Sequence, residues 1–563
     1  MNPKNFNKLF KKRAFLVYLS SILFCTLILY ALIDIHIIKH DFYEKKFKEQ
    51  SIGRIEIPSY RGRILDRNGI VLAYSLPSYS IAIRPNQIEM NRIPEIYSFL
   101  TENSIDIGTQ KEFVDLVVKL REDNVPFYFI KRKFSNTIGK FSKINSFKGI
   151  EIIREPTGKR YYNFECMKDI IGIVDIDEKG IEGIELYLEQ YESTIKGTNG
   201  YYELMFDALG NPNYNRVISY RPPIDGKDVK LSIDVILQQS IDVLARKKMT
   251  EHGASEVTIV VANKYGEILS CVSVDKEPND FVIGGINKLY EPGSIFKIFT
   301  VVAALECGLS PKERFFSGPS IVIDGWTINN ADDGLYTSGY ENMEDILTYS
   351  FNVGTVTLMQ KIGRKRFIQY LHKLGFYEYS GVEHPSDVKP LLGDLRDEPD
   401  IRFATISFGQ GIAVTPLHIL RLMVIIANGG YKVPLTFLKK SSISMKEKVL
   451  SDYTVKEIRK YLRSVVCKGT GKKAEVPGYY CAGKTGTAQM PSPDGGYSEG
   501  KYIASFVGFF PFFDPEYIII VSVKEPKGMY YGGQVAAPIF RETVALIISH
   551  YNLKPYKEVQ NKE

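Results

Sequence analysis

A serine and a lysine three residues apart could together carry out nucleophilic chemistry. The pattern Ser-x-x-Lys begins at five positions: Ser193, Ser273, Ser294, Ser386 and Ser498. Only Ser294 opens a long apolar segment, YEPGSIFKIFTVVAALECG (290–308), which Pro292-Gly293 precedes and Gly308 ends. Proline and glycine at these places predict a helix that begins near the serine.

Lys297 is the residue that could activate Ser294. Residues three apart share a helix face, so the lysine amine can reach the serine hydroxyl. Burial among apolar neighbours disfavours the charged ammonium and favours a neutral amine that can accept a proton. The helix N-terminus would also bring backbone N–H groups near the nucleophile. At the other four matches, a surface serine beside a solvated lysine is the simpler interpretation.

A Ser-x-Asn motif occurs once, from Ser350 to Asn352, inside a segment that otherwise looks helical. Positions two apart do not share a face of a regular helix. If both side chains point to one site, the chain must turn between them.

A Lys-Thr-Gly motif also occurs once, at Lys484, Thr485 and Gly486, and Thr487 follows it. It comes just before two apolar segments that read as strands. A glycine within a strand lets another backbone approach closely, and an edge strand here could pair with an extended peptide. Each motif alone could be packing or turn chemistry, but three in this order indicate one site.

The segments around these motifs predict the framework that must position them. Strands are expected within 256–274, 502–513 and 517–526, and helices at 231–247 and 536–551. Helices and antiparallel-looking strands in separate blocks indicate an α+β domain of about 320 residues.

The preceding residues predict further elements and a boundary. Asn68-Gly69 signals a hairpin, 181–192 reads as a helix, and SYRPPIDGKD (219–228) suggests a domain boundary.

The N-terminal segment predicts a membrane anchor. Residues 14–33 carry no charge, and a helix needs roughly 20 such residues to cross the hydrocarbon core. Residues 1–13 carry five basic side chains and no acidic one, which favours a cytoplasmic N-terminus and an exported body. A cleaved signal peptide is the alternative, but its apolar region is usually only about 7 to 15 residues long.

Composition excludes several classes of protein. The 563 residues are 44% hydrophobic and 24% charged, which is typical of globular proteins rather than disordered ones. Most of the net charge of +7 lies in the first thirteen residues, so nucleic-acid binding has little support. The six cysteines form no C-x-x-C pair, and we expect neither a disulfide framework nor a metal site.

SIFK (294–297), SFN (350–352) and KTGT (484–487) match the three active-site motifs of penicillin-binding proteins and serine β-lactamases. The segments that resemble class B, monofunctional penicillin-binding proteins are RGRILDRNG (61–69), RYYNFECMKDIIGIVDIDEKGIEGIE (160–185), SFGQGIAVTPLH (407–418) and ANGG (427–430). The sequences of these segments are most similar to those of division-type enzymes.

The resemblance implies an α+β architecture with three main parts. These are a single N-terminal transmembrane helix, an elongated pedestal, and a transpeptidase domain like that of serine β-lactamases, with an antiparallel sheet flanked by helices. The expected limits are a leader at 1–13, an anchor at 14–36, a dimerisation-type pedestal at 37–225, a transpeptidase domain at 226–550 and a polar tail at 551–563.

The function that the resemblance implies is a D,D-transpeptidase that cross-links septal peptidoglycan. Ser294 would attack the penultimate carbonyl of a stem peptide ending in D-Ala-D-Ala, and Lys297 would accept the serine proton. Ser350 and Lys484 would relay a proton to the leaving D-Ala, while Asn352 positions the substrate amide and Lys297.

The family's pattern also assigns the oxyanion and the terminal carboxylate. Backbone N–H groups of Ser294 and Thr487 would hold the oxyanion, and Thr485, Gly486 and Thr487 would bind the carboxylate. An amine of a neighbouring stem peptide would resolve the acyl-enzyme, with no cofactor.

Further implications concern partners and location. The expected partners are stem peptides on lipid-linked nascent glycan, covalently bound β-lactams, a SEDS-family glycosyltransferase and divisome proteins, with no nucleic acid. The expected location is the cytoplasmic (inner) membrane, crossed once, with the N-terminus in the cytoplasm and the catalytic domain outside it.

Three alternatives stay open. An elongation-type transpeptidase would share all the motifs. A β-lactamase-like hydrolase is disfavoured by the long pedestal and the anchor. A catalytically idle scaffold that only binds β-lactams is disfavoured by the intact motifs.

Overall fold

The computed structural model describes residues 3–134, 146–191, 195–207, 212–277, 283–330, 339–440, 447–492 and 496–556. By its internal contacts the chain forms two compact units. One joins Met1–Arg61 with Lys196–Gly226, and the other joins Gly62–Ile195 with Lys227–Glu563. The domain limits expected above follow another division and stay predictions.

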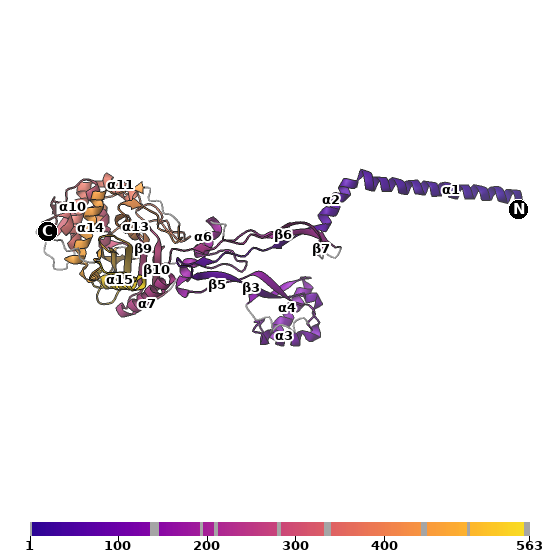
Figure 1. Ribbon diagram of the computed structural model, residues 1–563, viewed down its shortest axis with the longest axis horizontal. Helices are drawn as coiled ribbons and strands as arrows, with labels where there is room; N and C mark the ends of the chain where they lie inside the picture. The colour runs from indigo at the N-terminus through magenta and orange to yellow at the C-terminus, as the bar shows by residue number, and fades with distance from the viewer. Residues whose placement is uncertain are drawn as a thin grey trace. The chain divides into compact units, whose positions relative to one another are not determined.

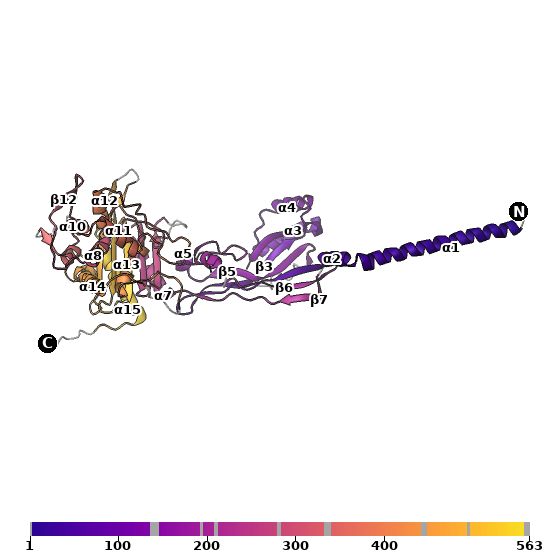
Figure 2. The ribbon, with the colours of Figure 1, turned by 90° about the horizontal axis from the view of Figure 1, so that it is seen from above.

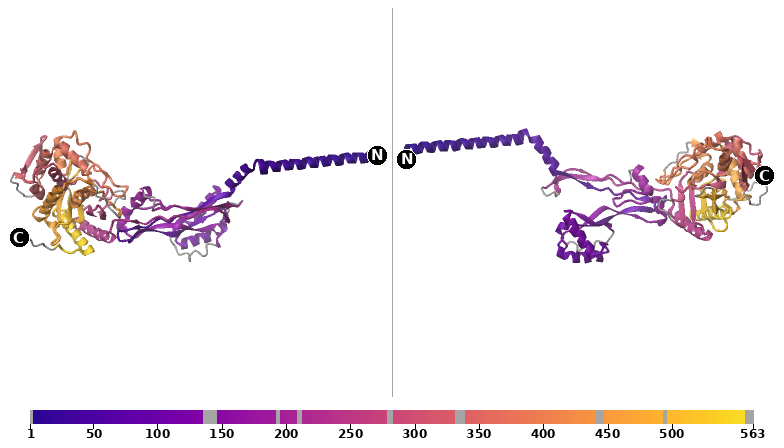
Figure 3. Two further views of the ribbon diagram at one scale, coloured as in Figure 1. Left: turned by 45° about the horizontal axis from the view of Figure 1, so that its top comes forward. Right: turned by 180° about the vertical axis from the view of Figure 1, so that it is seen from behind.

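The first unit begins with a long apolar helix. Helix α1 (Pro3–Ile33) continues through a π-helical turn (Asp34–Ile38) into α2 (His40–Ser51). Figure 3 shows the helical path bending where α1 gives way to α2, as π-turns often cause. Within Phe10–Ile38, the most apolar window of 18 residues has a mean hydropathy of 2.4, and none of that window is buried. Its length and composition suit a single membrane-spanning anchor.

A three-stranded antiparallel sheet completes the first unit. Its order is β1 (Ile52–Ile57), β6 (Gly200–Phe206), β7 (Pro212–Arg221), and Figure 2 shows the strands side by side.

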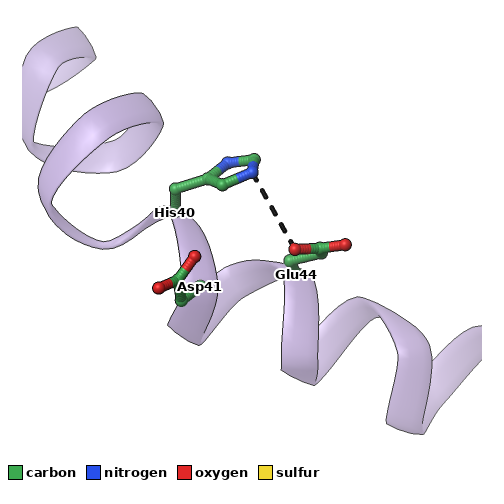
Figure 4. Close-up of side chains that lie close together, drawn as sticks. All are labelled: His40, Asp41 and Glu44. Carbon is green, nitrogen blue, oxygen red and sulfur yellow. Dashed lines mark ion pairs between the residues drawn. The ribbon is translucent and has the colours of Figure 1, made fainter.

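Three potential metal ligands lie together on α2 (Figure 4). His40 Nε2 is 3.9 Å from Glu44 Oε2, and Asp41 is beside them. Among the described residues this is the one such group, and Glu44 also pairs with Lys48 at 2.8 Å. All are exposed, so we assign them to ordinary ion pairing along a helix surface.

The N-terminal part of the second unit contains a mixed sheet. Its order is β4 (Tyr128–Phe134), β3 (Val71–Ile83), β2 (Ile64–Leu65), β8 (Val229–Lys230), and β5 (Ile150–Tyr162) also pairs with β3. Helices α3 (Ile93–Glu102) and α4 (Gln110–Glu122) form a small lobe (Figure 1), and they share an apolar core with residues of β3 and β5. Two short helices follow, α5 (Lys168–Ile171) and α6 (Gly183–Tyr191).

The Asn68-Gly69 hairpin is confirmed, and it does more than reverse the chain. Asp66 accepts hydrogen bonds from the backbone N–H groups of Asn68 and Ile70, each at 2.8 Å. Asn68 Nδ2 donates to Asp234 Oδ2 at 3.1 Å. Asp234 is the N-cap of α7 (Val235–His252), so the turn is bonded to the first helix of the C-terminal part of the second unit.

The C-terminal part of the second unit is built on a five-stranded antiparallel sheet. Its order is β10 (Ile268–Asp275), β9 (Glu256–Asn263), β19 (Tyr517–Lys524), β18 (Tyr497–Phe510), β17 (Ala482–Pro491). Every residue of β9 is buried because both sheet faces are covered. One face packs with α7 and α15 (Ala536–Tyr551), the other with α8 (Lys297–Glu306) and α13 (Pro416–Ala427). The expected α+β fold is confirmed.

The remaining elements surround this sheet. The helices are α9 (Met343–Tyr349), α10 (Asn352–Ile362), α11 (Arg364–Lys373), α12 (Asp400–Ser407) and α14 (Asp452–Cys467). The paired strands are β11 (Phe315–Phe316) with β14 (Tyr340–Glu341), β12 (Ser320–Ile323) with β13 (Trp326–Asn329), and β15 (Tyr431–Lys432) with β16 (Glu447–Lys448).

Candidate active site

Ser294 stands where the sequence places it, at the start of a helix. It lies in a 3-10 turn (Gly293–Phe296) that runs directly into α8 and is half-buried. Ser273 and Ser498 lie in strands, Ser386 lies in a turn, and Ser193 falls outside the described residues. Among the described Ser-x-x-Lys matches, Ser294 is therefore the one that opens a helix.

Lys297 is fully buried, one helical turn beyond Ser294. Its Nζ donates to the backbone oxygen of Ser350 and to Asn352 Oδ1 at 2.7 Å, and lies 3.2 Å from Ser350 Oγ. A neutral amine has two N–H groups and one lone pair. The two carbonyl oxygens can take both N–H groups, which leaves the lone pair for a hydroxyl.

Ser350 shows why the Ser-x-Asn motif converges. It lies at the break between α9 and α10 with φ 65° and ψ 38°, a left-handed conformation uncommon for a residue with a side chain. The predicted turn is confirmed. Asn352 Nδ2 donates to the backbone oxygen of Asn329 at 2.9 Å, so the Asn352 Oδ1 atom is held toward Lys297.

The Lys-Thr-Gly motif lies on β17, at the edge of the sheet. Lys484 is fully buried, and its Nζ donates to the backbone oxygen of Thr485 at 3.2 Å. Thr487 Oγ1 accepts from the backbone N–H of Gly532 at 3.0 Å. Thr485 Oγ1 lies 2.6 Å from Thr470 Oγ1, so both threonine side chains are fixed.

Two glycines let β17 lie against the 3-10 turn Gly293–Phe296, which carries Ser294 and is called the nucleophile turn below. A Cβ on Gly486 would collide first with Ser505 Oγ on β18, and it would lie 3.0 Å from Ile295 Cγ2 and 3.2 Å from the backbone oxygen of Pro292. A Cβ on Gly293 would lie 3.0 Å from the backbone oxygen of Thr487. The expectation that a strand glycine permits close backbone approach therefore holds at Gly486.

The sequence did not predict the hydrogen bonds that hold the nucleophile turn and α8 against residues 407–409; these bonds are called the brace below. The N–H of Gly293 donates to the backbone oxygen of Gly409 at 2.9 Å, and Thr300 Oγ1 donates to that of Ser407 at 2.6 Å. Gly409 has φ 86°, and a Cβ there would collide with the backbone of Gly293. No local spacing signals these contacts, because more than one hundred residues separate their partners.

Glu291 extends this brace to the sheet. The carboxylate accepts from Gly411 N at 2.9 Å and from the Tyr497 hydroxyl at 3.1 Å. Burial raises the pKa of the Glu291 carboxyl, and these two hydrogen bonds oppose that rise.

Two known protein-family descriptions match this chain. The description "Penicillin binding protein transpeptidase domain" matches residues 257–545, and "Penicillin-binding Protein dimerisation domain" matches residues 56–231. The chain belongs to the penicillin-binding protein family. All three motifs of this penicillin-binding protein lie inside the transpeptidase match.

Curated relatives agree with this assignment. The chain is 30% identical over 539 residues to "Stage V sporulation protein D" of Bacillus subtilis, covering 89% of this chain and 80% of the relative. It is 30% identical over 541 residues to "Probable peptidoglycan D,D-transpeptidase PenA" of Neisseria gonorrhoeae, covering 91% and 88%. Both relatives therefore match over nearly the whole chain.

Solved structures share the fold. A peptidoglycan synthetase from Bifidobacterium adolescentis has a TM-score of 0.72 at 20% identity, covering 91% of this chain and 98% of that one. Penicillin binding protein 3 of Mycobacterium tuberculosis, complexed with aztreonam, has a TM-score of 0.64 at 23% identity, covering 89% and 98%.

The packing of β17 on the nucleophile turn makes a prediction. We expect the added methyl group of Gly486→Ala to crowd Ser505, Ile295 and Pro292, to displace β17, and to lower the rate of β-lactam acylation about 10²-fold by misplacing the reacting groups. Stopped-flow acylation with a chromogenic β-lactam measures the rate. Gln489→Ala, on the same strand, adds no atom and serves as the control. An unchanged rate in Gly486→Ala would show that this close approach does not matter.

Proposed function

We propose that this penicillin-binding protein cross-links peptidoglycan at the division septum through a Ser294 acyl-enzyme. The chain is a serine-type D-Ala-D-Ala transpeptidase of cell-wall synthesis by family. The observation that carries the residue assignment is the buried Lys297 amine, which bonds to Ser350 and Asn352 one turn from Ser294.

In the first half-reaction, Ser294 Oγ bonds to the carbonyl carbon of the penultimate D-Ala while its proton passes to Lys297. The bond to the terminal D-Ala breaks, and Ser350 and Lys484 relay a proton to its leaving amine. The backbone N–H groups of Ser294 and Thr487 stabilise the oxyanion. The close packing of their two elements supports this assignment.

Substrate binding falls to β17 and to Asn352. Thr485, Gly486 and Thr487 bind the terminal carboxylate, aided by the positive charge of Lys484. Asn352 orients the substrate amide, and it also positions Lys297. The edge position of β17 leaves one side of the strand for an extended peptide.

The topology follows from the N-terminal residues. The basic leader stays in the cytoplasm and the catalytic region is exported, as the charge bias around Phe10–Ile38 supports. In the cytoplasmic membrane the anchor and the pedestal contact a SEDS-family glycosyltransferase and divisome proteins. The resemblance to class B enzymes supports these partners.

Labelling with a membrane-impermeant fluorescent penicillin tests both nucleophile and topology. Added to intact spheroplasts, it should label the wild-type protein and Ser386→Ala, which alters another Ser-x-x-Lys match, but not Ser294→Ala. Labelling of Ser294→Ala would overturn the nucleophile. Labelling of the wild type only after permeabilisation would overturn the export of the domain.

A second variant separates a base from a mere positive charge. Lys297→Arg keeps the charge but cannot deprotonate. We expect it to fold, judged by thermal melting, and to lose about 10² to 10⁴ in the second-order rate of acylation. Lys389→Arg, at the lysine of the Ser386 match, should acylate normally. A loss of less than about tenfold in Lys297→Arg would exclude the base role.

The proposed septal role rests on the resemblance of residues 160–185 and 407–418 to the same segments of division-type enzymes. We expect depletion of the protein to give long undivided cells and a fluorescent fusion to gather at the division site. Rounded cells with a uniform sidewall signal would instead assign the protein to elongation.

A further inference from the structure

A cavity of about 600 Å³ lies in the N-terminal part of the second unit, and no residue of the three motifs lines it. Its lining comes from β4, β5, the segment 103–105 that follows α3, and the loop 173–178. We call it the β4–β5 cavity. Its volume is typical of ligand-binding cavities, and the proposed reaction does not account for it.

A bulge in β4 brings neighbouring side chains into the lining of this cavity. The register of β3 and β4 leaves one extra residue on β4 between Lys131 and Phe134. Successive side chains of a regular strand point to opposite faces, whereas residues 131–134 all line the cavity. The Ser80 hydroxyl accepts from the N–H of Lys133 at 3.0 Å and so holds the bulge. Bulges that redirect side chains are common beside functional sites.

Left-handed backbone conformations also gather at this cavity. Ser104, Lys133 and Glu178 have φ angles of 61°, 49° and 61°, which are uncommon for residues that carry a side chain. All three residues line the cavity. Such conformations cost free energy, and they concentrate at active sites and ligand-binding segments. Their presence at one cavity therefore points to a functional site.

Buried nitrogen atoms of the lining residues lack hydrogen-bond acceptors. Among the residues that the structure describes, three buried arginine nitrogens have no partner, and two of them, Arg132 Nε and Arg160 Nη2, belong to this lining. The Arg160 side chain is only 1% exposed. Its Nε donates to Glu185 and its Nη1 to the backbone oxygen of Gly62, each at 2.8 Å. A buried donor without an acceptor destabilises the fold, so an acceptor bound in the cavity would remove that cost.

Three lysines add positive charge to the lining. Lys133 is 9% exposed, while Lys131 and Lys159 are exposed. Within the described parts of the chain, none of these three has a carboxylate at ion-pair distance. A nearly buried ammonium without a counter-ion is costly, because burial removes its hydration. The lysines thus leave room for an anion.

The acidic groups around the cavity bind other partners. Asp175, which lines it, accepts from two backbone N–H groups of its own loop at 2.8 and 2.9 Å. Asp177 and Glu155 both pair with Arg132, at 2.9 and 3.3 Å. These carboxylates therefore hold the loop and the arginine in place, and they do not neutralise the lysines.

We propose that the β4–β5 cavity binds the phosphate of an anionic ligand, with Arg132, Lys133 and Arg160 as hydrogen-bond donors. A phosphoryl group offers three strong acceptor oxygens and more than one negative charge. A carboxylate offers only two oxygens and one charge. A prenyl diphosphate, a lipid headgroup and free phosphate share this chemistry. The inference does not rest on the proposed function, because it uses no motif residue.

Binding of inorganic pyrophosphate to the full-length protein in detergent, measured by isothermal titration calorimetry, tests the proposal. We expect saturable binding by the wild type and roughly tenfold weaker binding by Lys133→Met, which loses a charge-assisted hydrogen bond. Lys111→Met removes an exposed lysine on α4 outside the cavity, and it should bind as the wild type does. Absence of saturable binding by the wild type, or equal binding by Lys133→Met, would overturn the proposal.

Thermal melting separates a ligand contact from a structural role. Lys133→Met removes a nearly buried charge that has no counter-ion, so without pyrophosphate it should melt at or above the temperature of the wild type. Pyrophosphate should raise the melting temperature of the wild type more than that of the variant. A lower melting temperature of Lys133→Met without pyrophosphate would show that this lysine stabilises the free protein, and would contradict the assignment.

A second variant tests the other wall of the cavity. Lys159→Met alters an exposed lysine on β5, where the added strain is small, and it should also weaken pyrophosphate binding. Acylation by benzylpenicillin should be unchanged in both lysine variants, because neither touches the motifs. Pyrophosphate affinity that Lys159→Met leaves intact would remove β5 from the site and refute the proposal as stated.

Further probes identify the source of the phosphate. Farnesyl diphosphate carries a prenyl chain, and dihexanoyl phosphatidylglycerol carries a lipid headgroup. Tighter binding of either one than of pyrophosphate would assign the ligand to that class, and equal affinities would show that the site recognises phosphate alone. Citrate carries its charge on carboxylates, so citrate binding as tight as that of pyrophosphate would overturn the assignment to phosphate.

Discussion

Burying one amine inside an apolar helix is the constraint on which the catalytic region depends. An unpaired ammonium or amine at the position of Lys297 would cost several kcal/mol. The fold meets this with oxygens of two residues, Ser350 and Asn352. To present them, the chain accepts a left-handed Ser350 and ties Asn352 to Asn329. The break between α9 and α10 and the contact with β13 thus position the oxygens that surround one buried side chain.

A second set of contacts holds the nucleophile turn between two backbones. β17 lies on one side of the turn through Gly486, and the loop at Gly409 lies on the other through a backbone hydrogen bond. Interactions made by backbone atoms leave little freedom for side-chain rearrangement. They suit the proposed site, in which the hydroxyl, the amine and the oxyanion donors keep fixed separations during two successive acyl transfers.

Local signals in the sequence were enough to predict a large part of this molecule. The Ser294–Lys297 spacing, the turn at Ser350 and the Asn68-Gly69 hairpin each depend on residues only a few positions apart. The strands β9, β18 and β19 were readable because burial on both faces demands continuous apolar runs. The brace from Thr300 to Ser407 and the pairing of Thr470 with Thr485 were not predictable. Each joins segments whose proximity only the finished fold creates.

The glycine contacts at the nucleophile turn also limit how this enzyme can evolve under antibiotic selection. Any side chain at Gly293, Gly409 or Gly486 would meet backbone atoms on a neighbouring segment. At the proposed site the natural donor and a β-lactam meet the same backbone, so a substitution that displaces it would weaken the reaction with both. Side chains can vary without moving this backbone at partly exposed positions farther along β17, such as Gln489 and Met490.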